Sequence, residues 1–429
     1  MPSTPITYRR PGVVCVDHVV DVPLDHDRPD SSRIEVFARE VVAADKERAD
    51  LPYLLFLQGG PGGKAERPAP PSGWLTRALR DFRVVLLDQR GTGRSTPANR
   101  QSLAGLSPAD QEGYLAHFRA DSIVRDAELV RTQLIGDRPW TVLGQSFGGF
   151  CCLTYLSRSP EGLAGALING GLASLTATAD DVYRAAYPRV LAKNRQYFER
   201  YPGDAEIARR VADHLEAHDV RMPTGERLSF RRFQTMGITF GGAGKFDSLH
   251  YLLEEAFTAG PDGPALSDTF LRGVDATVSF AERPLYAALH EPIYAQGAAS
   301  GWAAERIRAE FPQFDASPTG PLLFTGEMIY PWQFDEDPAL APLREAADLL
   351  ANRDDWPALY DVDRLADNNV PVVAAVYADD MYVDRDHSLQ TAAAVRGLRT
   401  WVTNEFEHDG LRQGSAVLDR LIAMLNGMA

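Results

Sequence analysis

The sequence predicts an α/β protein whose mostly parallel central sheet is flanked by helices and interrupted by a large helical insertion. Short, continuous apolar runs recur in the first 170 residues, at 53–57, 84–87, 140–143 and 166–168. Such runs are typical of strands buried on both faces. Helix-like stretches alternate with them, at 122–134 and 147–157. This alternation favours parallel strands covered by helices.

The second observation is a change of character after Gly171. Helical patterns dominate residues 176–367, at 181–201, 204–218, 249–257 and 342–352. Pro188 lies inside the first of these, so we expect that helix to be kinked or split. Pro342 opens the last one, which suits a first helical position.

Strand-like runs return at 370–377 and 400–402, followed by a final helix at 415–426. We therefore expect a core built from residues 1–172 and 369–429, with a helical cap at 173–368. Such an insertion is expected over the carboxyl ends of the strands, where open α/β sheets bind ligands. The β-rich segments 12–22 and 33–42 are predicted to form an antiparallel pair at the sheet edge.

Composition excludes several classes of protein. The 429 residues are 45% hydrophobic and carry a net charge of −15, which is typical of a globular chain and unsuited to nucleic acid or anionic membranes. No run approaches 18 apolar residues, so no transmembrane helix is expected. The three cysteines, Cys15, Cys151 and Cys152, indicate no disulfide framework, and we expect a cytoplasmic protein.

The segment Gly144-Gln145-Ser146-Phe147-Gly148 carries the clearest chemical pattern, G-x-S-x-G. It follows an apolar strand and precedes a helix, which is the context of a nucleophile elbow. The tight turn presents the Ser146 hydroxyl beside a helix N-terminus, where free N–H groups favour developing negative charge.

A glycine-rich loop, Gln58-Gly59-Gly60-Pro61-Gly62-Gly63, follows the 53–57 strand. Its N–H groups can stabilise an oxyanion together with the N–H of Phe147. We favour Gly60 as the loop donor, with Gly59 as the alternative and as a substrate contact. The segment 88–95, Asp-Gln-Arg-Gly-Thr-Gly-Arg-Ser, is interpreted as structural support for the floor of the site.

A serine nucleophile needs a base, and the base needs an orienting carboxylate. Behind a nucleophile elbow these come later in the chain, acid first and histidine second. Asp380 follows the 370–377 strand and is our choice of acid, with Asp379 as the alternative. His408 follows the 400–402 strand and is the predicted base. No pattern of metal ligands occurs, so neither a metal nor a cofactor is expected.

Together these segments resemble the proline iminopeptidases, or prolyl aminopeptidases, of the α/β-hydrolase fold. The resemblance is carried by G-G-P-G-G at 59–63, D-Q-R-G-T-G-R-S at 88–95 and G-Q-S-F-G-G at 144–149. It is clear over about residues 50–170 and 370–412. The family usually has histidine where Gln58 stands, and often tryptophan where Phe147 stands.

The resemblance implies release of an N-terminal residue, preferably proline, from a small peptide or aminoacyl amide, through an acyl-enzyme. It also implies glutamates in the cap that bind the free amine, because a buried ammonium requires carboxylate partners. We favour Glu291 and Glu327 over Glu254, Glu255 and Glu282. The aromatic residues Phe147, Tyr330 and Trp332 are expected to wall the proline pocket.

Two other functions fit the sequence. An esterase or amidase acting on small acyl substrates would use the same triad without carboxylates for an amine. A non-catalytic ligand sensor would keep the fold, but such proteins usually lose a member of the triad, and here every position has an occupant.

Overall fold

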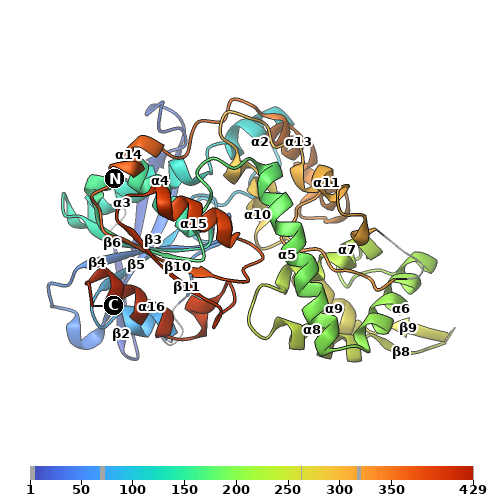
Figure 1. Ribbon diagram of the computed structural model, residues 1–429. Coiled ribbons are helices and arrows are strands. Elements are labelled where there is room, and N and C mark those ends of the chain that lie inside the picture. Colours follow the sequence, from blue (N-terminus) through green and yellow to red (C-terminus); the bar gives the residue numbers. More distant parts are fainter. Residues whose placement is uncertain (1–4, 68–72, 262, 316–319, 429) are drawn as a thin grey trace.

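The computed structural model describes residues 5–67, 73–261, 263–315 and 320–428, and within them nine strands form one central sheet (Figure 1). The strand order is β1-β2-β3-β5-β4-β6-β7-β10-β11. The strands are β1 (Ile6–Arg10), β2 (Val13–Pro23), β3 (Arg33–Ala43), β4 (Tyr53–Leu57), β5 (Arg83–Asp88), β6 (Trp140–Gln145), β7 (Leu163–Asn169), β10 (Val372–Tyr377) and β11 (Leu398–Thr403).

The six strands from β5 to β11 in this order are parallel, whereas β1, β2 and β3 are antiparallel to their neighbours. The predicted class and the antiparallel pairing of the two N-terminal segments are therefore confirmed. The prediction missed β1, a short and mostly exposed strand that forms the edge of the sheet outside β2.

Helices cover both faces of the sheet because successive side chains of each strand point to opposite faces. Leu55 and Leu57 of β4 pack with α3 (Ala120–Ile135) and α4 (Phe147–Arg158). Leu54 and Phe56 pack with α1 (Gly73–Ala78) and α16 (Ala416–Leu425) on the other face. The continuous apolar runs thus mark strands that are buried on both sides. Three further helices of this part are α2 (Pro108–Leu115), α14 (Val362–Ala366) and α15 (Arg385–Ala394).

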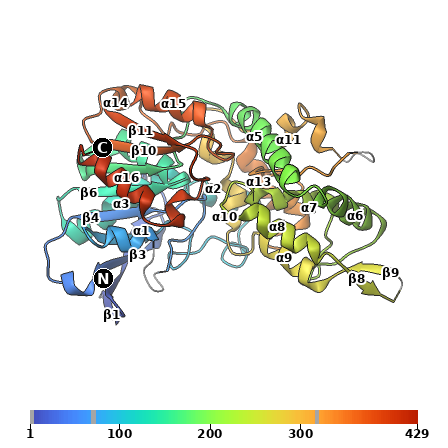
Figure 2. The same ribbon diagram turned by 60° about the horizontal axis from the view of Figure 1, so that its bottom comes forward.

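Between β7 and β10 the chain leaves the sheet and forms a mainly helical segment beside it (Figures 1 and 2). This helical segment contains a second hydrophobic core. Its helices are α5 (Ala179–Arg200), α6 (Asp204–Ala217), α7 (Phe230–Gln234), α8 (Lys245–Glu254), α9 (Asp268–Val278), α10 (Pro284–Leu289), α11 (Ala303–Arg308), α12 (Gln333–Glu336) and α13 (Arg344–Asn352). No helix in the part of the chain that the structure describes is long and apolar enough to cross a membrane.

Three details of this helical segment differ from expectation. α5 is one unbroken element with Pro188 inside it, so the split is not observed. Pro342 lies in a short 3₁₀ turn directly before α13 rather than in the helix itself. The helix expected at 249–257 ends at Glu254, because Phe257 begins a two-stranded sheet of β8 (Phe257–Gly260) and β9 (Gly263–Leu266).

The helix that follows the serine turn lies against β4 at a glycine. A Cβ atom added to Gly148 would lie 1.9 Å from the carbonyl oxygen of Leu57, the last residue of β4. No side chain fits at that distance, so α4 approaches the sheet only because Gly148 has none.

We expect Gly148→Ala to lower the free energy of unfolding by about 1–3 kcal/mol, since α4 must move away from β4 to make room. Urea or thermal unfolding measures the change. Gly113→Ala in α2 is the matched control, because nothing lies within 4 Å of its added Cβ atom, and it should be neutral or slightly stabilising. Equal stability of the two variants would contradict the proposed close approach.

Candidate active site

Ser146 lies in a strained turn between β6 and α4. It caps the N-terminus of α4 with φ 54° and ψ −124°, a backbone conformation that residues with a side chain rarely adopt. Glycines on two sides make room for the turn: a Cβ on Gly59 would lie 2.9 Å from the Cβ of Ser146, and one on Gly171 would lie 2.2 Å from its carbonyl oxygen. The hydroxyl is therefore presented at the end of the sheet by a turn that only this packing permits.

His408 and Asp380 form a buried pair on the loops that follow β11 and β10. Nδ1 of His408 lies 2.7 Å from Oδ2 of Asp380. The other carboxylate oxygen of Asp380 accepts hydrogen bonds from the backbone N–H groups of Tyr382 (2.8 Å) and Val383 (3.1 Å). Asp379 is exposed and makes no contact with the imidazole, so geometry favours Asp380 over the alternative acid.

Two opposing effects set the pKa of His408. Burial is the largest and by itself lowers the pKa, because a charged imidazolium is poorly solvated inside the protein. The charge of Asp380 and its hydrogen bond raise the pKa, with a smaller contribution from Glu327. The net pKa of His408 lies above its ordinary value of 6.5. The pair is therefore arranged to stabilise an imidazolium.

Ser146 and His408 face one cavity of about 420 Å³. No hydrogen bond joins Ser146 Oγ to the imidazole, although both residues are described by the structure. Because Nδ1 of His408 faces Asp380, Nε2 is the ring nitrogen left for the cavity. Charged and polar side chains complete the lining, among them Gln58, Gln145, Lys245, Arg283, Tyr286, Glu327, Tyr382, Asp409 and Arg412.

The predicted oxyanion loop lines the same cavity through Gly59 and Gly60. Gly60 has φ +144°, and a Cβ there would lie 2.9 Å from the nitrogen of Gly63, so the loop requires glycine. Phe147 is the first residue of α4, and its N–H therefore has no acceptor within the helix. The two predicted donors thus belong to the loop beside Ser146 and to the first residue of α4.

The 88–95 segment supports this loop from below. Asp88 is fully buried and accepts hydrogen bonds from the N–H groups of Ala65 (3.0 Å) and Arg94 (2.8 Å). The side-chain amide of Gln89 donates to the carbonyl of Gln58 at 2.9 Å. These contacts fix both ends of the glycine-rich loop, and they bear out the structural interpretation of the segment.

Glu327 enters the cavity from the helical segment. Its carboxylate accepts a short hydrogen bond from the hydroxyl of Tyr286 in α10. Burial, followed by the charge of Glu327, raises the pKa of Tyr286, so the phenol stays a proton donor to the carboxylate. Glu327 remains partly exposed, and it is the predicted amine-binding glutamate that the structure places with Ser146 and His408.

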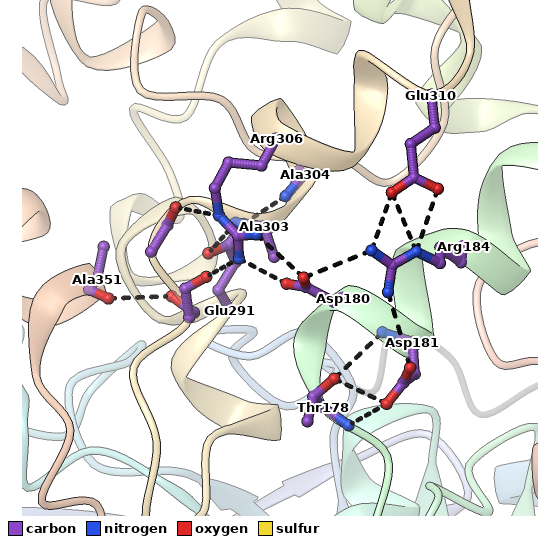
Figure 3. Close-up of polar contacts among 12 residues, drawn as sticks. Thr178, Asp180, Asp181, Arg184, Glu291, Ala303, Ala304, Arg306, Glu310 and Ala351 are labelled. Atoms are coloured by element: carbon purple, nitrogen blue, oxygen red, sulfur yellow. Dashed lines mark hydrogen bonds and ion pairs between the residues drawn. The ribbon is translucent and has the colours of Figure 1, made fainter.

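Glu291, the other favoured glutamate, does not line this cavity. Figure 3 shows its carboxylate beside Ala303 and Ala304 instead. Its carboxylate oxygens accept hydrogen bonds from the N–H groups of Ala303 (3.0 Å) and Ala304 (2.9 Å), the first two residues of α11. Burial raises the pKa of Glu291, and these hydrogen bonds oppose the rise. The carboxylate satisfies a buried helix N-terminus, which corrects the prediction that it binds substrate.

Tyr330 and Trp332 do not line the cavity either. Both belong to the hydrophobic core of the helical segment, where their rings stack with centroids 5.5 Å apart. The hydroxyl of Tyr330 is 3.1 Å from that of Tyr187 in α5. Their expected role as walls of a proline pocket is therefore corrected to core packing. The same holds for Phe147, which is buried in the core around the sheet and does not line the cavity with its side chain.

Among the cavity residues that the sequence analysis missed are two tyrosines, Tyr286 and Tyr382. The ring of Tyr382 meets the His408 imidazole edge-on, with centroids 4.8 Å apart, and its hydroxyl donates to the carbonyl of Ile238. Its place two residues after Asp380 marks it as a neighbour of the acid. Nothing in the sequence around Tyr286 distinguishes it, since only the folded chain brings α10 to Glu327.

α5 is bound by ion pairs to the loops that carry Asp380 and His408. Arg189 lies 2.8 Å from Asp384, in the loop that holds Asp380. Lys193 is 3% exposed and lies 2.7 Å from Glu407, the residue before His408. The helical segment thus contacts the loops of the acid and of the base directly.

Comparison with known proteins agrees with this arrangement. The model of the alpha/beta hydrolase fold family matches residues 52–267. A proline iminopeptidase of Aeromonas sobria is 51% identical over 424 residues, which cover 98% of this chain and 99% of that protein. The chain belongs to the proline iminopeptidase family. A second relative, proline iminopeptidase aneH of Aspergillus aculeatus, is 34% identical over 94% of this chain and 92% of its own length.

Among the residues that the structure describes in this family member, no group of three or more His, Cys, Asp or Glu side chains is placed to hold a metal ion. The three cysteines are free and buried. Burial raises the pKa of Cys152 beyond the range of an ordinary thiol, so it packs as a small apolar side chain.

We expect Asp380→Asn to lower kcat/KM for a prolyl arylamide by roughly a thousand- to ten-thousandfold, because an amide cannot stabilise the imidazolium. Attack requires a neutral imidazole, so the acid limb of the pH profile follows the pKa of His408. In the native enzyme we expect this limb above pH 6.5, since the pKa is raised. In the variant the charge of Asp380 is lost while burial still lowers the pKa of His408, so the acid limb should move to lower pH.

Asp379→Asn is the matched control. Its maximal kcat/KM and the pH of its acid limb should both stay near those of the native protein. A larger loss in Asp379→Asn than in Asp380→Asn, measured by pH-rate profiles, would contradict the assignment of the acid.

Proposed function

We propose that this chain is a serine aminopeptidase that releases an N-terminal residue, preferably proline, from small peptides or amides. The observation that carries the proposal is the meeting of Ser146, His408 and the carboxylate of Glu327 in one cavity. The first two residues supply acyl transfer, and the third supplies a partner for a free ammonium group. The relatives, which are proline iminopeptidases, support the preference for proline.

In this proposal Ser146 attacks the scissile carbonyl while Nε2 of His408 takes the hydroxyl proton. Asp380 holds Nδ1 and stabilises the imidazolium, and the N–H groups of Phe147 and Gly60 stabilise the oxyanion. His408 then gives its proton to the leaving amine. Water attacks the acyl-enzyme with His408 again as base, so Ser146 is restored.

The substrate amine is bound from the cap. We propose that residues 173–368 act as a cap domain over a core made of residues 1–172 and 369–429. Glu327 accepts hydrogen bonds from the ammonium group, and Tyr286 holds the carboxylate in place. Because the ammonium loses water on binding, a charged acceptor is needed to offset the cost of its desolvation.

A small-acyl esterase or amidase remains the second candidate, because it would use the same three residues. The partly buried carboxylate of Glu327 argues against it. A neutral acyl group gains nothing from an anion in its binding site, whereas an aminoacyl group requires one.

We expect Ser146→Ala to abolish turnover of a prolyl arylamide and labelling by a fluorophosphonate. Glu327→Gln should raise KM for the same substrate by about ten- to a hundredfold, because a hydrogen bond to a charged group contributes about 1.5–3 kcal/mol. An N-acetylated prolyl arylamide should be a poor substrate of the native protein, because it has no ammonium group to bind.

Glu291→Gln is the comparison variant for this experiment. Since its carboxylate caps α11 outside the cavity, it should lower the melting temperature and leave KM unchanged. Efficient cleavage of the N-acetylated substrate, or an unchanged KM in Glu327→Gln, would instead favour the esterase or amidase.

A further inference from the structure

The cavity of Ser146 has a basic wall that the proposed chemistry does not use. Lys245 at the start of α8 and Arg412 in the 3₁₀ turn Gly410–Gln413 both line it. In the described part of the chain, no carboxylate lies within ion-pair distance of the Lys245 ammonium. Arg412 pairs with Glu66 through Nε at 3.3 Å and remains exposed along half of its side chain. The chain as a whole has a net charge of −15, so two solvent-exposed cations beside a serine nucleophile point to an anionic ligand.

These two cations lie on the side of the cavity that holds the base. Arg412 follows His408 by four residues, and the backbone N–H of His408 donates to the carbonyl of Gly241 at 3.1 Å. A Cβ on the next residue, Gly242, would lie 3.0 Å from Cγ of Lys245 and 3.5 Å from a carboxylate oxygen of Asp409. Lys245 therefore reaches the cavity beside the loop that carries the imidazole.

The amine side of the cavity is different. There α10 contributes Tyr286, whose hydroxyl donates to Glu327. The third cation of the cavity, Arg283, lies 4.8 Å above the Tyr286 ring and so belongs to this side. The amine side thus carries Glu327 together with Arg283, and the side of the base carries Lys245 and Arg412 together with Asp409.

The direction of the reaction fixes how a peptide lies between these charges. His408 must protonate the leaving amine, so the leaving residue lies on the imidazole side of the scissile bond. A prolyl dipeptide carries its ammonium on the acyl residue and its carboxylate on the leaving residue. Its two charges therefore match the anion at Glu327 and the cations beside His408.

We propose that Lys245 and Arg412 bind the C-terminal carboxylate of the leaving residue, so that short prolyl peptides with a free carboxyl end are the preferred substrates. The inference rests on the proposed aminopeptidase function and adds a subsite for the leaving group. Asp409 lies in the same wall, and its Oδ1 accepts hydrogen bonds from the N–H of Ala243 (3.1 Å) and from Gln413 (2.9 Å). These bonds hold one of its oxygens away from the substrate.

The test compares three substrates: prolyl-alanine, prolyl-alanine amide and a prolyl arylamide. The native protein should hydrolyse the free acid with a higher kcat/KM than the amide. Lys245→Met and the double variant Lys245→Met/Arg412→Met should reduce this acid-to-amide ratio, by about tenfold in the double variant and mainly through KM. High salt should reduce the ratio in the native protein, because both cations are exposed to solvent.

Arg399→Gln is the matched control, since it removes one exposed positive charge from β11 and lines no cavity described here. It should leave the ratio unchanged. The double variant loses the Arg412–Glu66 ion pair and could unfold for that reason. The single variant Lys245→Met breaks no ion pair among the described residues, so it tests the subsite in either case.

The outcomes separate the two proposals. Cleavage of the arylamide with no preference for the free acid, or a ratio in Lys245→Met equal to that in Arg399→Gln, would overturn the carboxylate subsite and leave the aminopeptidase standing. Failure of the native protein to cleave any of the three substrates would overturn the aminopeptidase, and the subsite with it.

Discussion

The hydrogen bond between His408 and Asp380 is the contact on which the rest of the site depends. It joins the loops that follow β10 and β11, two neighbouring parallel strands, and it is possible because parallel strands end at the same edge of the sheet. By occupying Nδ1 it directs Nε2 toward the cavity that Ser146 also faces. Burial alone would favour a neutral imidazole, and the carboxylate reverses that preference, so the pKa of His408 lies above its ordinary value.

Much of the core was predictable from the sequence because its determinants are local. The strands that carry Ser146, Asp380 and His408 are short apolar runs that stop at a loop, and the order of the three residues follows from the direction of the chain. The local sequence does not determine which of Asp379 and Asp380 faces the histidine. Adjacent residues point in different directions, and only the folded loop shows that Asp380 faces inward and bonds to the N–H groups of Tyr382 and Val383.

The helical segment was harder to predict, for a physical reason. Glu291 and Glu327 both lie among apolar and aromatic residues, and both are removed at least in part from solvent. The carboxylate of Glu291 accepts hydrogen bonds from the N-terminus of α11, which begins twelve residues further along the chain. The carboxylate of Glu327 accepts one from a tyrosine of α10. A buried carboxylate must find a donor, but the sequence does not say whether the donor is a helix end or a ligand. The same holds for Tyr330 and Trp332, because a second hydrophobic core needs aromatic side chains as much as a binding pocket does.

The two ion pairs of α5 have a consequence for attempts to alter specificity. Arg189 and Lys193 reach from the insertion to the loops that carry Asp380 and His408, so the insertion helps to hold both loops in place. A chimaera that exchanged this insertion for that of another hydrolase would remove both anchors at once. A foreign insertion would therefore fit this enzyme only if its own helix at the place of α5 carried two cations. These cations would have to lie one helical turn apart and face the two loops.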